Sequence, residues 1–280
     1  MTASAFIPEE LPEMGTGGRL FCLATHHKTG TVWMRKVLHA YMEATDVPVH
    51  GCYSRKKVDL LPERGMVMVV NWSGSFPRRL WTREEARFIH VIRDPRDVLL
   101  SGMRYHQIAK LGKEKFLQET REDWGGLTYQ DHLKALPSDH DRLLFEMGEK
   151  HDKTVAEMLA WRWGHARAAE LRYEDLMQDP SCDLFRDAIT NMGVDDLDIE
   201  LMVKLYWELS LFGGLAEKEA RGDVPKGHIS QAGGGKVAQW RQKMPRAIAE
   251  IYAERYGPAL KALGYADDDS WVGETPKELA

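Results

Sequence analysis

Residues 20–33 read LFCLATHHKTGTVW, an apolar run that leads into a turn of lysine, threonine and glycine. The apolar run predicts a buried strand over Leu20–Ala24, and the residues after the turn predict a helix over Val32–Glu43. The first N–H groups of a helix lack partners within the helix and carry partial positive charge. A strand that turns directly into a helix N-terminus is therefore a binding site for a phosphate or sulfate group.

The turn itself contains further groups that suit an anion. Lys28 adds a positive charge, and the hydroxyls of Thr29 and Thr31 add hydrogen-bond donors. Gly30 has no Cβ, so the backbone can approach a ligand closely at this position. The turn after the first predicted strand is thus our first candidate site.

The composition limits the class of protein. The 280 residues suffice for one large α/β domain or two small ones, and the net charge of −5 does not indicate a nucleic-acid-binding surface. The three cysteines, Cys22, Cys52 and Cys182, are too few for a disulfide framework and lack the spacing of metal ligands. Because Met1–Pro12 lacks the features of a signal peptide and no apolar run is long enough to cross a membrane, we expect a cytoplasmic protein with no membrane span.

Short apolar runs alternate with segments of helical periodicity along the chain. This alternation predicts an α/β fold in which helices flank both faces of a central parallel sheet. The predicted strands are Leu20–Ala24, Met66–Asn71, Phe88–Ile92 and Ala169–Tyr173. The predicted helices are Val32–Glu43, Val98–Lys110, Tyr129–Ala135, Leu144–Trp163, Cys182–Met192, Asp198–Ser210 and Arg246–Leu263.

A second candidate anion site follows the strand predicted over Phe88–Ile92. Asp94 suits the N-cap of the next helix and Pro95 its first position, so Arg93 lies at the carboxyl end of the strand. Ligands bind at that edge of open α/β sheets, and a guanidinium can hold a phosphate with two hydrogen bonds. Ser101 lies two turns into the following helix, seven residues after the cap.

Arg93 has a second interpretation, in which it pairs with Asp97 or Glu174 and only braces the turn. The presence of two anion sites on one sheet favours the binding role. Together they require a ligand with charged groups at both ends, such as a nucleotide phosphorylated at two positions.

Taken in their order along the chain, these motifs resemble those of the soluble sulfotransferases that use 3′-phosphoadenosine 5′-phosphosulfate (PAPS). Lys28–Trp33 is similar to the loop that binds the 5′-phosphosulfate in that family, and Arg93–Ser101 is similar to its 3′-phosphate site. Arg172–Leu176 resembles the strand end whose tyrosine faces the adenine, and Gly235–Arg241 resembles the glycine-rich loop that closes over the 3′-phosphate. The similarity runs from residue 21 to about residue 256, and several motifs in family order form a specific pattern.

The resemblance implies a P-loop-NTPase-like sulfotransferase fold, with a single domain over residues 19–266 and peripheral tails at residues 1–18 and 267–280. The implied reaction is in-line transfer of a sulfuryl group from PAPS to a hydroxyl or amine of a small-molecule acceptor, with PAP as product. No metal is required for this transfer, because positioning and fixed positive charge stabilise the transition state. The class of acceptor stays open: a phenol, a steroid-like alcohol, a sugar and a lipid head group all fit.

The resemblance also implies roles for individual residues. Lys28 would contact the transferring group and neutralise charge on the leaving phosphate, and Trp33 and Phe212 would sandwich the adenine. Trp33 and Tyr173 could instead be core aromatic residues. The cofactor-binding residues implied are Lys28, Thr29, Gly30, Thr31, Val32, Trp33, Arg93, Ser101, Tyr173, Ser210, Phe212, Gly235 and Lys236.

The chain departs from the family at the general base. The usual base is a histidine at the end of the strand before the Arg93 strand, where this chain has Asn71 or Ser73, neither of which accepts a proton well at neutral pH. His27, next to Lys28, is our candidate, because an imidazole there could reach an acceptor hydroxyl and titrate near neutrality. Alternatively, His26 and His27 are only hydrogen-bonded strand-end residues, and His106, His50 or an acidic residue is the base.

A second departure lies in the late loop, for which residues 213–235 predict a long irregular segment. Gly233 and Gly234 stand where the family has a basic pair that grips the 3′-phosphate. Lys226, His228 or Lys236 could take over that role. The family's dimerisation motif is also altered, with Pro245 and Arg246 in place of threonine and valine, so we do not expect a dimer of that type.

Two other functions stay open at this point. A P-loop kinase or NTPase would also place lysine, glycine and threonine between a strand and a helix, but in its motif the glycine precedes the lysine, whereas Lys28 precedes Gly30. A non-catalytic PAP-binding relative is the other alternative, because the usual histidine is missing.

Overall fold

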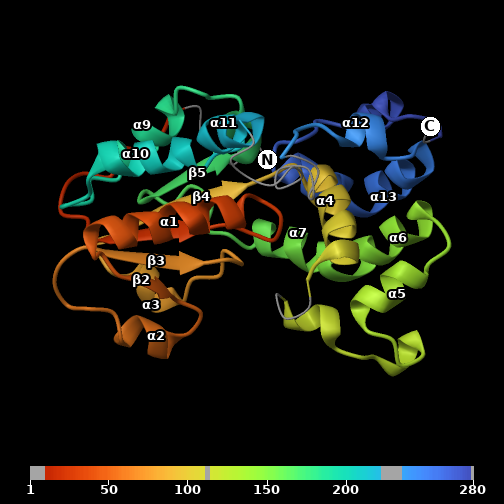
Figure 1. Cartoon of the computed structure of the whole chain (residues 1–280), viewed down its shortest axis with the longest axis horizontal. Coiled ribbons are helices and arrows are strands. Elements are labelled where there is room, and N and C mark those ends of the chain that lie inside the picture. The colour runs from red at the N-terminus through yellow and green to blue at the C-terminus, as the bar shows by residue number, and fades with distance from the viewer. Residues whose placement is uncertain (1–9, 111–113, 222–234, 279–280) are drawn as a thin grey trace.

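The computed structural model describes residues 10–110, 114–221 and 235–278. Within these residues, five strands form one parallel sheet in the order β2-β3-β1-β4-β5 (Figure 1). The strands are β1 (Leu20–Ala24), β2 (Val49–Gly51), β3 (Val67–Asn71), β4 (Ala86–Ile92) and β5 (Ala168–Arg172). The predicted α/β class and parallel sheet are therefore confirmed.

The order of the strands reverses at β1, and this brings the two candidate sites together. β1 lies between β3 and β4, with Ala24 level with Asn71 and His90. The loops that leave β1 and β4 at their carboxyl ends are consequently neighbours. This switch point is the place where open α/β sheets bind ligands.

Helices cover both faces of the sheet, which explains why β1, β3 and β4 are buried along their whole length. Phe21 and Leu23 of β1 face one cluster of apolar side chains, and Leu20 and Cys22 face another, as alternation along a strand requires. The first cluster is covered by α1 (Thr31–Thr45), α8 (Tyr173–Met177), α9 (Asp183–Asn191) and α10 (Ile199–Glu208). The second is covered by α2 (Arg55–Asp59) and α3 (Arg78–Trp81).

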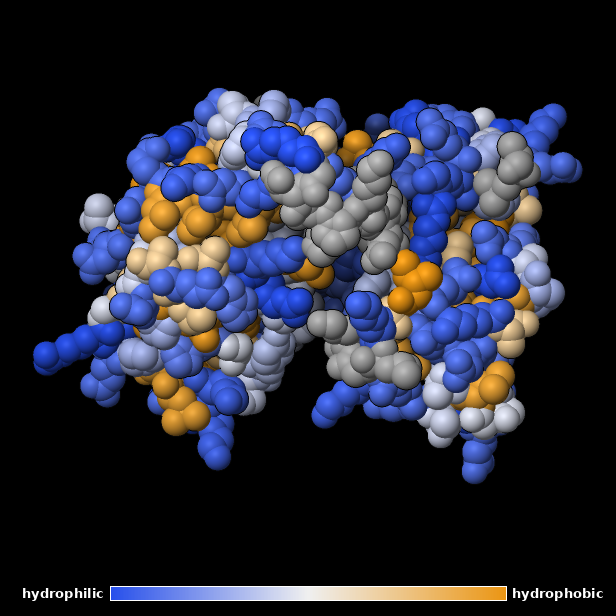
Figure 2. All heavy atoms as spheres, viewed as in Figure 1, coloured by the Kyte–Doolittle hydropathy of each residue, from blue (hydrophilic) through white to orange (hydrophobic). Residues whose placement is uncertain are grey.

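A helical part stands beside the sheet, and α4 leads into it from the end of β4 (Figure 1). Its apolar interior is a separate cluster centred on Leu133, Leu143 and Tyr252. Figure 2 shows the molecular surface notched between the sheet part and this helical part. The main helices here are α4 (Pro95–Ile108), α5 (Tyr129–Ala135), α6 (Asp139–Glu146), α7 (Asp152–Leu159), α12 (Trp240–Lys243) and α13 (Arg246–Ala262).

Four predicted strands are confirmed to within two residues at each end, and the fifth, β2, was missed. β2 is a three-residue edge strand that is only partly buried, so it carries no apolar run. The single helix predicted over Leu144–Trp163 is wrong. The chain forms α6 from the Ser138 N-cap, a π-helical turn over Met147–His151 with non-helical angles at Glu149, and then α7.

Two further expectations concern the C-terminal third. The long loop predicted over residues 213–235 is wrong in its first part, where α11 (Gly214–Arg221) forms; residues 222–234 lie outside the described residues. After residue 266, a 3-10 helix over Asp269–Glu274 packs onto the domain through Trp271, which is 4% exposed and 5.5 Å from the ring of Trp240. The domain bounds of 19 and 266 stay a prediction. In the described part of the chain, no helix is both long and apolar enough to span a membrane.

Candidate active site

The turn after β1 is tied together around the carbonyl oxygen of His26. That oxygen accepts hydrogen bonds from the hydroxyls of Thr29, at 3.1 Å, and Thr31, at 2.7 Å. The Thr29 hydroxyl lies 3.2 Å from the carbonyl oxygen of Val91 on β4, and that of Thr31 lies 2.7 Å from the Thr25 hydroxyl. The structure therefore differs from our expectation: both hydroxyls brace the loop from within and do not point outward as donors to a ligand.

The helix N-terminus beside this loop is open. Gly30 is the N-cap of α1 with φ +98°, a left-handed conformation that suits glycine, and no side chain of the described residues caps the helix. A Cβ on Gly30 would lie 3.3 Å from the ring of Tyr173. The Val32 side chain is 57% exposed in the first turn. Within the described part of the chain, the backbone N–H groups of this turn thus have no side-chain cap, as an anion site at a helix N-terminus requires.

Lys28 adopts an unusual backbone conformation, with φ +66°. Left-handed backbone costs a non-glycine residue on the order of 1–3 kcal/mol, and such strain often accompanies function. The Lys28 Nζ lies 3.9 Å from the centre of the Tyr105 ring. Burial and the nearby Arg93 guanidinium lower the pKa of Lys28 to about 8. A bound anion would relieve the repulsion between the two cations.

Arg93 joins the first loop to the late loop. Its guanidinium donates to the carbonyl oxygens of Lys28, at 3.2 Å, and Lys236, at 2.9 Å, and lies over the ring of Tyr173. An ion pair with Asp97 at 3.7 Å is also present, as the bracing interpretation predicted. The Nε atom of Arg93 is buried and has no hydrogen-bond partner among the described residues. This guanidinium therefore braces the loops and has one buried donor without a partner among the described residues.

The residues around Arg93 adopt the predicted local structure. Asp94 is the N-cap of α4 and accepts a hydrogen bond from the N–H of Arg96, with Pro95 in the first turn. Glu174 accepts from the N–H of Asp94 at 2.9 Å and from the Tyr265 hydroxyl at 3.1 Å, so its carboxylate bonds to these two groups and not to Arg93. Ser101 lies on α4 and is buried.

The aromatic residues near α1 do not form the expected adenine sandwich. The rings of Trp33 and Phe212 meet edge to face, with 5.6 Å between centres and 85° between planes, so they are not parallel walls. Trp33 is buried and donates to the carbonyl oxygen of Tyr206. Ser210 is also buried, and its hydroxyl donates to Trp207. In this structure these residues pack against α10.

The late loop reaches the same strand ends. The Tyr173 hydroxyl donates to the carbonyl oxygen of Gly235 at 3.1 Å, and Lys236 holds Arg93 through its own carbonyl. These bonds place Gly235 and Lys236 beside the turn after β5 and the turn after β4. Lys226, His228, Gly233 and Gly234, named above for the phosphate clamp, lie outside the described residues.

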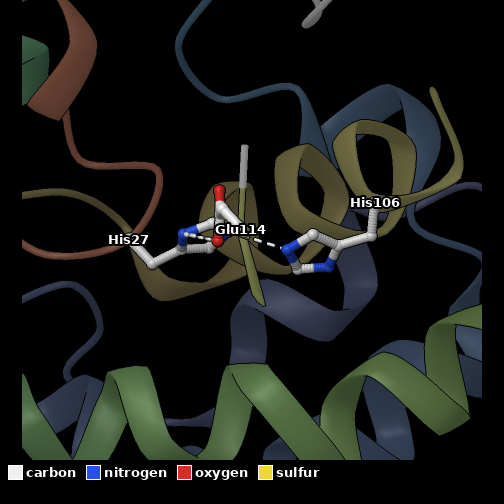
Figure 3. A group of neighbouring side chains, drawn as sticks. All are labelled: His27, His106 and Glu114. Atoms are coloured by element: carbon white, nitrogen blue, oxygen red, sulfur yellow. Dashed lines mark hydrogen bonds and ion pairs between the residues drawn. The ribbon is translucent and has the colours of Figure 1, made fainter. Parts of the chain in front are cut away.

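The histidine next to Lys28 belongs to a chain of hydrogen-bonded side chains. The Nε2 atoms of His27 and His106 are 2.9 Å apart, and Nδ1 of His106 is 2.7 Å from Oε2 of Glu146. The Tyr129 hydroxyl donates to the same Glu146 oxygen at 2.8 Å. Figure 3 shows His27 and His106 facing each other, with Glu114 beside them. His27 is therefore more than an isolated strand-end residue.

The electrostatic surroundings keep His27 neutral at pH 7. Burial lowers the pKa of His27 well below its usual range, and the neighbouring His106 and Lys28 lower it further. A neutral imidazole has one nitrogen that can accept a proton. Lys28 and His27 together thus offer a cation and a proton acceptor on adjacent residues.

The other candidate bases take structural roles. His26 is fully buried, and its Nε2 lies 2.7 Å from Nε2 of His90 on β4, as the strand-end interpretation predicted for it. The Asn71 amide donates to the carbonyls of Cys52 and Ser75, and its oxygen accepts from the turn that follows β3. His50 lies on the edge strand β2.

Three donor atoms near Lys28 come close enough for a metal ion. Those of His27, His106 and Glu114, the residues drawn in Figure 3, lie within 4.8 Å of one another. The direct hydrogen bond between the two imidazoles uses Nε2 of both rings. The described geometry is thus that of a hydrogen-bonded histidine pair.

Sequence reasoning named His106 as a lesser candidate and missed its partners. Glu146, Tyr129 and Tyr105 come from separate helices, and no spacing in the sequence links them to Lys28. Only the packing of α4 against α5 and α6 brings them together.

The comparison with family models agrees with the sequence motifs. The family model of the sulfotransferase domain matches residues 20–186, which include β1, β4 and β5. The mouse sulfotransferase SULT7A1 complexed with PAP is 16% identical, with a TM-score of 0.47 and 91% of this chain and 88% of that chain covered. Retinol dehydratase in complex with androsterone and inactive cofactor PAP is 13% identical, with a TM-score of 0.45 and 92% and 84% covered. A search of the curated proteins found no match.

The family match decides between the functions that the sequence left open. It covers more than half of the chain and contains both the Lys28 loop and the Arg93 turn. A kinase or NTPase is not favoured, in agreement with the order of lysine and glycine. The chain belongs to the sulfotransferase domain family and is a sulfotransferase enzyme.

Proposed function

We propose that this sulfotransferase takes its sulfuryl group from PAPS and passes it to a hydroxyl or amine of a small molecule, with Lys28 and His27 as the catalytic residues. The observation that carries the proposal is the adjacency of a buried cation and a neutral imidazole beside the open N-terminus of α1. These groups stand at the switch point of the sheet, between the loops that leave β1 and β4.

The residues present fit a nucleotide with two charged ends. Gly30 leaves the helix N-terminus open at one end, and Arg93 keeps a buried Nε donor free at the other. The two sites share the hydrogen bond between Arg93 and the Lys28 carbonyl, so one ligand can reach both. When bound, PAPS supplies the sulfuryl group and a phosphate that can leave.

Lys28 and His27 have separate tasks in this proposal. The Lys28 Nζ donates to the oxygen on which negative charge develops, and a fixed cation in a buried site is worth more there than in water. The His27 imidazole accepts the proton that the acceptor loses as it attacks. No described residue forms a covalent bond in this scheme.

The acceptor would enter on the side of β2 and β3. A cavity of about 240 Å³ lies between α1 and these strands. A cation and aromatic rings suit an aromatic acceptor, including one with a carboxylate. Residues lining the cavity include Arg35, His39, Tyr53 and Trp72.

We also infer that the protein works in the cytoplasm. Its three cysteines, Cys22, Cys52 and Cys182, are all free and buried, as in a reducing compartment. Burial raises the pKa of each thiol, which disfavours the reactive thiolate.

The test is transfer of label from [35S]PAPS to a panel of phenols, carboxylated phenols, steroid-like alcohols, sugars and amines, with wild type, Lys28→Ala and His27→Ala. PAP binding to each variant is measured by calorimetry as a control for folding. We expect Lys28→Ala to lose on the order of 10²–10³ in kcat. Full activity in Lys28→Ala would refute the site, and full activity in His27→Ala would refute only the base. PAP binding without any transfer would identify a non-catalytic relative.

A further inference from the structure

We propose that His106 and Glu146 are positioning residues that hold His27 in one tautomer. Through the intervening His106 ring, the negative charge of Glu146 stabilises protonated His27. We call the hydrogen-bonded series His27, His106 and Glu146 the relay. In this tautomer the Nε2–H of His27 donates to His106, so Nδ1 of His27 is the atom that accepts the proton of the acceptor. This inference rests on the proposed role of His27, and it adds two residues that no sequence motif indicated.

Glu146 is the fixed end of the relay. It is 1% exposed, and its Oε2 atom receives the Tyr129 hydroxyl at 2.8 Å and the His106 ring at 2.7 Å. Because a carboxylate oxygen can only accept, the Tyr129 hydroxyl and the His106 ring are the donors in these two hydrogen bonds. Gly102 makes room for it, because a Cβ at that position would lie 2.8 Å from Oε1 of Glu146.

The hydrogen-bond network then assigns the protons on the two imidazoles. Since Glu146 accepts from Nδ1 of His106, the neutral His106 ring has only a lone pair at Nε2. Nε2 of His27, at 2.9 Å, must supply the hydrogen for this bond. The remaining nitrogen of His27, Nδ1, therefore carries the free lone pair.

Nδ1 of His27 is available to a substrate. The carboxylate oxygen Oε2 of Glu114 is 3.7 Å from it, which is too far for a hydrogen bond. The His27 side chain keeps 13% of its surface exposed, whereas the His106 side chain is fully buried. The relay thus has a buried end at Glu146 and an open end at His27.

The proton balance of the step is simple. As the acceptor oxygen bonds to sulfur, the bond from sulfur to the bridging oxygen of PAPS would break and PAP would leave with that electron pair. The proton of the acceptor O–H would go to Nδ1 of His27. The resulting imidazolium keeps its Nε2–H directed at His106, where the negative charge of Glu146 stabilises it through the intervening ring. After product release, the proton leaves Nδ1 for solvent and the neutral tautomer returns.

Several charged groups face this imidazole, and each affects its charge. Lys28 on the same loop and Lys150 on the π-helical turn oppose protonation of His27. Glu114 faces Nδ1 from the segment that precedes a 3-10 helix, and Tyr105 on α4 lies 6.0 Å from the ring. Glu146 is the carboxylate that acts through a hydrogen-bonded partner. Removing its charge should therefore make His27 a weaker base.

The first test is Glu146→Gln, which keeps an oxygen acceptor but removes the charge. We expect kcat to fall on the order of ten- to hundred-fold, with unchanged KM for PAPS. In a plot of kcat against pH, the acidic limb should move to lower pH. A merely structural role of Glu146 would not produce this shift. The matched control is Glu254→Gln, the same exchange at an exposed site on α13, which should leave the profile unchanged.

The second test needs no variant. Nitrogen-15 NMR of the imidazoles in the wild-type protein reads the tautomer directly, and we expect His27 as Nε2–H and His106 as Nδ1–H. A His27 ring protonated at Nδ1, or a Glu146→Gln enzyme with wild-type kcat and pH profile, would overturn the relay. If His27→Ala were fully active, the proposed base would fall instead, whatever the tautomer.

Discussion

The carbonyl oxygen of Lys28 accepts a hydrogen bond from the guanidinium of Arg93 at 3.2 Å. This bond joins the loop after β1 to the loop after β4, although 65 positions separate the two residues. Because the same guanidinium also binds the Lys236 carbonyl, three segments of the chain meet at one side chain. The geometry of the proposed nucleotide site should therefore depend on Arg93 more than on any threonine of the first loop.

The first prediction concerns Arg93→Lys. Lysine keeps the charge but cannot bond two carbonyls and a ligand in one plane. We expect PAP affinity to fall about ten- to hundred-fold, because a hydrogen bond to a charged group contributes roughly 1.5–3 kcal/mol. Calorimetry measures the loss. The control ligand is adenosine 5′-phosphate, which lacks the 3′-phosphate, and equal losses for both ligands would contradict a 3′-phosphate role.

The second prediction concerns Gly30→Ala. The positive φ of Gly30 and the Tyr173 ring, 3.3 Å from an added Cβ, both oppose alanine. We expect a loss of roughly 1–3 kcal/mol in the free energy of unfolding together with weaker PAP binding. Gly65→Ala is the matched control, since Gly65 has φ +72° with nothing within 4 Å of an added Cβ. It should lose stability through strain but bind PAP normally, and weakened binding in both variants would count against a specific role of Gly30.

The outline of the fold could be predicted because apolar runs mark the buried strands. Leu20–Ala24 was predicted to the residue, since helices cover both faces of β1 and every side chain in it is apolar. Asp94 and Pro95 likewise start α4 as predicted, because an N-cap is a local interaction. β2 carries no such signal, since a short edge strand owes its conformation to pairing with β3.

The candidate site could be predicted only where one segment contains it. The proposed roles of Lys28 and Gly30 depend on their own turn, so the sequence indicates them. The bond between His106 and Glu146 depends on how α4 packs against α6, and the pattern of either helix alone does not contain it. The same holds for Trp33 and Phe212, whose edge-to-face contact follows from the packing of α10.

The third prediction concerns stability at low pH. Burial lowers the pKa values of His26 and His90, which form a buried pair. At pH values between the lowered pKa values of the folded protein and the pKa of about 6.5 in the unfolded chain, the unfolded chain binds more protons than the folded protein does. The free energy of unfolding should therefore fall as the pH drops below about 6.5, by up to about 1.4 kcal/mol per pH unit for each of the two histidines. Above that pH, this pair should not change it.

Thermal unfolding between pH 8 and pH 5 measures this slope. His90→Gln removes one of the two buried groups and should make the acidic slope shallower. His39→Gln, on the surface of α1, should leave it unchanged. An acidic slope of wild-type size in His90→Gln would show that other groups cause the acid sensitivity.

The fourth prediction is that chelation leaves the transfer reaction intact. Lys28, Arg93 and the N-terminus of α1 supply the positive charge that Mg²⁺ supplies in P-loop kinases, so we expect the rate after dialysis against EDTA to stay within about two-fold of the starting rate. The assay follows [35S]PAPS transfer before dialysis, after dialysis, and after addition of Mg²⁺ or Zn²⁺. Loss of activity that Mg²⁺ restores would favour a kinase-like site. Loss that Zn²⁺ alone restores would mean that His27, His106 and Glu114 bind a metal ion, and that the hydrogen-bonded pair described here is its unloaded state.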